Sequence, residues 1–119
     1  MGFVNIKMGL EKISSPSPRR EIEFLVDTGA LYTMAPASVL RQIGVEPRVQ
    51  VEFELADGSR IRQDVGEVRF HFNGQNAISR VIFGEENDAA VLGVVTLEEM
   101  GLEVDPVNKR VRPARLILY

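Results

Sequence analysis

One aspartate in this sequence is placed where a carboxylate could do chemistry. Asp27 directly follows the apolar run at residues 24–26 and directly precedes Thr28-Gly29-Ala30. A carboxylate at the end of a buried strand can serve as a general base or a general acid. The Asp-x-Gly spacing is also ordinary turn chemistry, because Asp accepts hydrogen bonds from nearby backbone N–H groups and Gly supplies unusual dihedral angles. The segment is therefore either a turn or part of an active site.

The elements that would position Asp27 begin with two strands. Residues 3–10 and 21–27 alternate or run apolar, and residues 14–20 between them are rich in Ser, Pro and Arg. This pattern predicts a hairpin with a long loop, in which Arg19 and Arg20 are solvated loop residues.

A short helix is predicted after the aspartate segment. Pro36 stands where the first helical residue is expected, and Gly44 stands where a helix would stop. Between them the apolar residues Val39, Leu40 and Ile43 have helical spacing.

The middle of the chain has the pattern of antiparallel strands. Residues 48–74 alternate between apolar and polar side chains, which predicts half-buried strands. Asp57-Gly58 inside this block is a strong hairpin signal, with the tip of the hairpin near residues 56–59. Asn73-Gly74 predicts a second turn, which leads into another strand at residues 76–84.

The last third of the chain opens with an apolar run at residues 89–95. Such a run predicts a strand buried on both sides, and its Gly93 indicates the close approach of another backbone. Thr96 and Glu99 have the spacing of a capping box, so a short helix is expected to begin at Thr96 and to end at Gly101.

Two more strands are predicted at residues 102–106 and 115–119, around a turn at residues 105–108. The total is about seven or eight strands and two short helices. The chain is therefore expected to form a single all-β domain over residues 1–119 with a barrel-like closure.

Composition and charge argue against several classes of function. The net charge of −3 and the sequence pI near 5.2 leave the chain without the basic field that binds nucleic acid. The sequence has no cysteine, and its one histidine, His71, lies between two phenylalanines and is interpreted as a packing or surface residue, so a zinc site is not expected. No apolar stretch reaches the length of a signal peptide or a membrane span, which predicts a cytoplasmic protein that does not bind membranes.

The order of three motifs resembles the retroviral-type (retropepsin-like) aspartic proteases, in particular the small single-domain versions found outside viruses. Residues 25–30, LVDTGA, are similar to the active-site segment of that family. Residues 51–63, VEFELADGSRIRQ, fall where its flap hairpin lies, and residues 89–106 are similar to its second glycine motif, helix and following strand. The resemblance spans about residues 21–106 and implies a closed β-barrel or sandwich that forms one half of a dimeric enzyme.

The resemblance also implies a role for each motif. Asp27, Thr28 and Gly29 would form the catalytic motif, with the Thr28 hydroxyl bonding across a two-fold axis and Gly29 allowing close approach to the carboxylate and the substrate. Ala30 would line the floor of the substrate site, and the flap hairpin at about residues 53–63 would close over an extended peptide. The implied flap contacts are Leu55, Ala56, Asp57, Gly58 and Ser59, and the implied apolar support of the active-site loop is Val91, Leu92 and Gly93. No cofactor or metal is implied.

The chemistry requires a second carboxylate. Hydrolysis of a peptide by carboxylates needs one that is ionised, to deprotonate water, and one that is protonated, to donate to the carbonyl oxygen. None of the other aspartates follows an apolar run and precedes Thr-Gly or Ser-Gly; they are Asp57, Asp64, Asp88 and Asp105. A homodimer in which Asp27 of each chain meets the other at a two-fold axis is therefore predicted.

The leading hypothesis is a homodimeric aspartic endopeptidase that acts on peptide or protein substrates. A second hypothesis is a peptide-binding or assembly module with the same fold and little proteolytic activity. Intact Asp27-Thr28-Gly29 favours the enzyme, because a binding module does not need a buried acid that costs free energy. A third hypothesis, an oligonucleotide-binding barrel, conflicts with the net charge and with the small number of aromatic residues.

Overall fold

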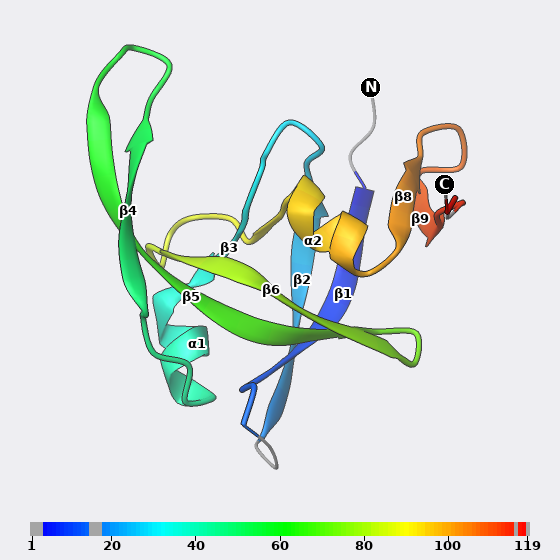
Figure 1. The fold of residues 1–119 in the computed structure, drawn as a ribbon, viewed down its shortest axis with the longest axis horizontal. Coiled ribbons are helices and arrows are strands. Elements are labelled where there is room, and N and C mark those ends of the chain that lie inside the picture. Colours follow the sequence, from blue (N-terminus) through cyan, green and yellow to red (C-terminus); the bar gives the residue numbers. More distant parts are fainter. Residues whose placement is uncertain (1–3, 15–17, 116, 119) are drawn as a thin grey trace.

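A computed structural model describes residues 4–14, 18–115 and 117–118 of the chain. Most of these residues lie in β-strands, and two short helices interrupt the strands (Figure 1), which confirms the predicted all-β class. The elements are β1 (Val4–Glu11), β2 (Arg19–Val26), β3 (Thr33–Pro36), α1 (Ala37–Gln42), β4 (Val49–Glu54), β5 (Arg60–Phe72), β6 (Gln75–Gly84), β7 (Val91–Leu92), α2 (Val94–Glu99), β8 (Leu102–Asp105) and β9 (Arg110–Pro113).

Seven of the described strands form one sheet that closes on itself. Their order is β1-β2-β7-β3-β6-β5-β4, and β1 also pairs with β5. Strand β5 makes the closure possible because it is 13 residues long: residues 60–65 pair with β4, whereas residues 69–71 pair with β1. The strands therefore make a closed circuit that starts and ends at β1, and β4 lies outside the circuit as an end strand.

The two turns predicted in the middle of the chain are confirmed. Gly58 has a φ of +87° in the turn between β4 and β5, and Asn73 and Gly74 have φ values of +49° and +79° in the turn between β5 and β6. Gly, and to a lesser degree Asn, tolerates this left-handed conformation. The hairpin of β4 and β5 projects from the rest of the molecule (Figure 1).

The core is built from the inward-facing residues of the closed sheet and from one face of each helix. Phe24 of β2 and Phe70 of β5 are fully buried, with ring centroids 6.2 Å apart. Leu40 of α1 and Leu97 of α2 are buried in the same cluster. The other buried members are Met8, Leu10, Ala35, Val39, Ile43, Val45, Val68, Val81, Phe83, Leu92, Met100 and Leu102.

Three sequence-based boundaries are corrected by the structure. Arg19 and Arg20 belong to β2 and not to a loop, because they pair with Glu11 and Leu10 of β1. Pro36 is the last residue of β3 and the N-cap of α1, so the helix begins one residue later than expected. The strand predicted at residues 115–119 is wrong for the described residues 115, 117 and 118, which have no regular structure; residues 116 and 119 lie outside the described part.

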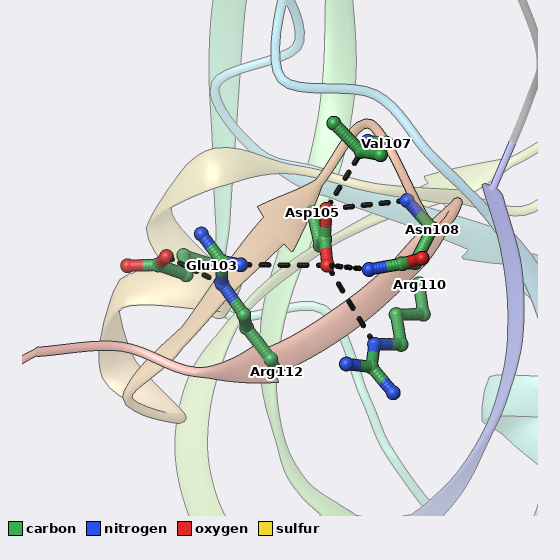
Figure 2. Close-up of polar contacts among 6 residues, drawn as sticks. All are labelled: Glu103, Asp105, Val107, Asn108, Arg110 and Arg112. Carbon is green, nitrogen blue, oxygen red and sulfur yellow. Dashed lines mark hydrogen bonds and ion pairs between the residues drawn. The ribbon is translucent and has the colours of Figure 1, made fainter.

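Strand β9 forms instead from the charged segment at residues 110–113. It pairs with β8 because its arginines form ion pairs with acidic side chains of β8. Figure 2 shows the turn between β8 and β9, in which the buried carboxylate of Asp105 accepts hydrogen bonds from the backbone N–H groups of Val107 and Asn108 and from the Asn108 side chain at 2.8 Å. Arg112 pairs with Glu103 at 2.8 Å and lies 3.4 Å from Asp105. The hydrogen bonds to Asp105 therefore stabilise the predicted turn at residues 105–108, and the cross-strand ion pairs stabilise the two strands that the turn connects.

Asp105 should make the stability of the protein depend on pH. Hydrogen bonds from the Asn108 side chain and then its backbone hold the pKa of Asp105 below its ordinary value of 3.8. A carboxyl whose pKa is depressed by folding stabilises the native state above the unfolded-state pKa, and this contribution is lost as the pH falls through the lower folded-state pKa. We expect Asp105→Asn to have a lower free energy of unfolding than wild type at pH 7. As the pH is lowered from 7 to below about 4, this free energy should fall less in the variant than in wild type.

The measurement is urea denaturation of both proteins between pH 7 and pH 2.5. Asn108→Ala removes the largest cause of the lowered Asp105 pKa, so it should reduce part of the pH dependence that Asp105→Asn reduces. The pKa of Asp57 is also lowered, chiefly by the Ser59 hydroxyl, but Asp57 is present in all three proteins and its effect cancels in the comparison. Equal slopes of stability against pH in the three proteins would contradict the role of Asp105.

Candidate active site

Asp27 is the first residue after β2, and its backbone and side chain together make a tight turn. Its N–H donates to the carbonyl oxygen of Leu92 at 3.0 Å, and its own carbonyl oxygen accepts from the N–H of Ala30 at 3.0 Å. One carboxylate oxygen, Oδ1, accepts the N–H of Gly29 at 2.8 Å. The segment is therefore a turn, and a turn of this kind also fixes the direction of the carboxylate.

The turn leaves its polar residues accessible in the single chain. Asp27, Thr28 and Gly29 are all exposed, and the side chain of Leu31 next to them is 57% exposed. A Cβ added at Gly29 would lie 3.2 Å from Oδ1 of Asp27, so glycine is the residue that fits best against the carboxylate. The loop thus presents a carboxylate at the surface from a fixed backbone, and the expectation that Asp27 is a buried acid is wrong for the single chain.

Strand β7 supports this turn from inside the molecule. Val91 and Leu92 pair in parallel with residues 25 and 26 of β2, and Val91 also pairs with Met34 of β3. Leu92 is fully buried. The structure therefore places residues 91 and 92 beside the end of β2, directly before Asp27, and the strand predicted at residues 89–95 is only two residues long.

Gly93 lies directly against the backbone of the loop that follows Asp27. A Cβ built on Gly93 would lie 2.5 Å from the carbonyl carbon of Tyr32 and 2.7 Å from the carbonyl oxygens of Leu31 and Tyr32. The N–H of Gly93 donates to Oγ1 of Thr33 at 3.0 Å. The predicted close approach of another backbone at Gly93 is confirmed.

Helix α2 begins earlier than the capping-box spacing predicts, and Thr96 is not its cap. The helix runs from Val94 with Gly93 as the N-cap, and no side chain caps it. The N–H groups of Val94 and Val95 donate instead to the carbonyl oxygens of Ala30 and Leu31, at 2.9 and 3.1 Å. These loop carbonyls satisfy the N–H groups that a helix leaves free at its start, so a side-chain cap is not needed.

Three buried hydroxyl groups hold the same region together; two of them, on Thr33 and Ser79, were not singled out from the sequence, and Thr96 was predicted only as a helix cap. Oγ1 of Thr96 lies 2.6 Å from Oγ1 of Thr33 and 3.0 Å from Oγ of Ser79. All three residues are buried. The available signal was that Thr96 is the one polar side chain in the otherwise apolar segment 91–97, but its partners are 17 and 63 residues away along the chain.

The predicted flap contacts lie at the tip of the β4–β5 hairpin and are exposed. The N–H of Leu55 donates to the carbonyl oxygen of Ser59 at 2.7 Å, and Oδ1 of Asp57 accepts the N–H and the hydroxyl of Ser59 at 2.9 and 2.6 Å. In Figure 1 this tip and the loop after β2 both rise toward the top of the view.

The structure brings some of the predicted site residues together and leaves others apart. Asp27 and Ala30 are joined to Leu92 and Val94 by backbone hydrogen bonds, and Gly29 donates to the Asp27 carboxylate. Within the described residues, no hydrogen bond joins the hairpin tip at residues 55–59 to the loop at residues 27–30. The hairpin and the loop that starts at Asp27 are instead in contact before the tip begins, where the ring of Phe53 in β4 contacts the ring of Tyr32.

In the described part of the chain, no three His, Cys, Asp or Glu side chains gather in a way that could hold a metal ion. Neither of the helices described there is long and apolar enough to cross a membrane. A scan against protein-family models finds no match, and a search of curated proteins finds no match either.

Proposed function

We propose that the protein is a homodimeric, retropepsin-like aspartic endopeptidase. The observation that carries this proposal is the placement of Asp27: an exposed carboxylate on a tight turn whose backbone is bonded to Leu92 and whose oxygen is oriented by Gly29. A catalytic group needs such a fixed position, because small errors in geometry lower the rate strongly. The closed sheet supports the proposal, as does the β4–β5 hairpin, which rises toward the same side of the view as the loop after β2 (Figure 1).

The proposed reaction uses Asp27 from each of two copies. The ionised carboxylate takes a proton from a water molecule, whose oxygen forms a bond to the carbonyl carbon of the peptide, while the protonated carboxyl gives its proton to the carbonyl oxygen. The C–N bond then breaks, the leaving nitrogen takes up a proton, and the products are a carboxylic acid and an amine. Two carboxylates so close together cannot both ionise easily, which divides the two roles between them.

The exposure of the Asp27 turn in one chain fits the need for a second chain. Asp27, Thr28, Gly29 and the apolar Leu31 would be covered by a partner related by two-fold symmetry. The Thr28 hydroxyl has no hydrogen-bond partner among the described residues of its own chain. It is therefore available to bond across the axis.

The experiment is a dilution series of the purified protein on a peptide library between pH 3 and pH 7, with the oligomeric state measured on the same samples. Because each site needs two chains, specific activity should fall in proportion to the fraction of dimer as the protein is diluted. Hydrolysis by a monomer would contradict the shared site.

The second candidate function is a peptide-binding or assembly module. Strand β4 favours it, because β4 ends the sheet and pairs only with β5 within the described chain, so its outer edge can accept an extended peptide as an added strand. A dimer that binds library peptides and cleaves none of them at any pH would support this function over the enzyme.

A further inference from the structure

Tyr32 is the residue of the Asp27 loop that touches the projecting hairpin. Its ring centroid lies 6.3 Å from that of Phe53 in β4, with an interplanar angle of 76°, which is an edge-to-face contact. The guanidinium carbon of Arg80 in β6 lies 5.8 Å from the centre of the Tyr32 ring. Both contacts have geometries that aromatic rings favour.

The backbone of Tyr32 is held on a fixed base. Its carbonyl group lies against Gly93. The carbonyl oxygen of Leu31, the residue before it, accepts the N–H of Val95. The hydroxyl of Thr33, the residue after it, bonds to the N–H of Gly93 and to the hydroxyl of Thr96. These contacts are made by residues 93–96, which directly follow Leu92, the residue that bonds to the Asp27 backbone. The position of the Tyr32 ring is therefore set by the structure that sets the position of the carboxylate.

The hairpin, by contrast, has little support of its own. In the described chain β4 pairs with β5 alone. The tip beyond Phe53 is held by hydrogen bonds within the turn, in which the Leu55 N–H donates to the Ser59 carbonyl oxygen and the Ser59 N–H donates to the Asp57 carboxylate. Phe53 and its cross-strand partner Ile61 lie on the two sides of this tip, one on β4 and the other on β5. The contact between Tyr32 and Phe53 thus joins the outer half of the hairpin to the Asp27 loop.

We propose that Tyr32 is a positioning residue for the hairpin: its ring holds Phe53, and through it the tip at residues 55–59, in a constant place relative to Asp27. In the proposed protease the hairpin covers the substrate, so this inference rests on the proposed function for its catalytic consequence. A loosened hairpin would be in the peptide-binding position for a smaller fraction of the time. The apparent affinity for peptide falls in proportion to the fraction of time that the hairpin spends in that position.

The test compares Tyr32→Leu, Tyr32→Phe and Phe53→Leu with wild type in the full chain. We expect Tyr32→Leu and Phe53→Leu to speed amide hydrogen exchange of residues 51–61 by about threefold to tenfold, and Tyr32→Phe to leave it unchanged, because the ring and not the hydroxyl makes the contact. The double variant should add little to either single one, because both remove the same contact. Val107→Ala, which shortens an exposed apolar side chain in the β8–β9 turn, is the matched control and should leave this exchange as in wild type.

The same variants give a catalytic readout. For peptide hydrolysis, KM should rise about threefold to tenfold in the two leucine variants, while kcat at saturating peptide changes less than about twofold, because bound substrate orders the hairpin itself. Exchange of residues 51–61 that is unchanged in both leucine variants would overturn the inference, whatever the activity. Absence of hydrolysis by the wild type would count against the proposed function alone, because the exchange measurement needs no substrate.

Discussion

Gly93→Ala should destabilise the protein by about 3 kcal/mol or more. The added Cβ would lie 2.5 Å from the carbonyl carbon of Tyr32 and 2.7 Å from two carbonyl oxygens. These neighbours are backbone atoms, which cannot rotate away as the end of a flexible side chain can. The contacts that must shift also include the N–H bonds from Val94 and Val95 to the Asp27 loop, so the strain cannot be relieved without loosening that loop.

Urea denaturation followed by far-ultraviolet circular dichroism measures this effect. Gly58→Ala is the matched control, because nothing lies within 4 Å of its added Cβ and only its φ of +87° opposes alanine. That backbone penalty is about 1–2 kcal/mol. If Gly93→Ala were no more destabilising than Gly58→Ala, the close packing of β7 against the Asp27 loop would be refuted.

In the proposed homodimeric protease, Asp27→Asn should lower kcat for peptide hydrolysis by at least about 10²- to 10⁴-fold, because both copies lose their acid-base group together. The fold should persist, since an amide oxygen at the same place can still accept the N–H of Gly29. Asp64→Asn is the control for removing one carboxylate: Asp64 lies on β5, where it accepts a hydrogen bond from Gln50 at 3.2 Å, and this variant should keep full activity.

Mixing the wild type with Asp27→Asn tests whether the site is shared. If the chains re-pair at random in an equal mixture, about one quarter of the dimers contain two aspartates, so activity should be about a quarter of that of wild type at the same total concentration. A site that is complete in one chain would retain about half. Hydrolysis that survives Asp27→Asn would rule out the carboxylate pair.

The parts of the fold that the sequence predicted correctly are those decided by neighbouring residues. Asp57-Gly58 and Asn73-Gly74 contain the residues that left-handed turns require, and the structure has its turns there. The apolar run before Asp27 forms the end of β2, and the glycine at residue 93 has the close neighbour that its position indicated. The pairing of a homodimer and the peptidase activity remain predictions.

The errors arose where distant residues decide the local structure. Thr96 and Glu99 have the spacing of a cap, but Thr96 bonds to Thr33 and Ser79, and the helix is capped by carbonyl groups of the Asp27 loop. Likewise the charged segment at residues 110–113 became a strand because Arg112 lies opposite Glu103 and Arg110 lies opposite Asp105. Spacing along the chain carries no information about such partners.

The hydrogen bond between Asp27 and Leu92 has a consequence for the order in which the protein assembles. The two residues are 65 positions apart, and the loop between them contains most of the remaining sheet. Contacts of this range form slowly, because a long stretch of chain must be ordered before they can stabilise anything. During synthesis Asp27 is made early, and bonds from Gly29 and Ala30 can form its turn locally, but the turn is not anchored to the rest of the fold until Leu92 and the start of α2 have been added. A nascent chain would therefore carry this carboxylate long before the bond to Leu92 could hold it in place, and in the proposed protease catalytic competence would wait until residues 92–95 had been made.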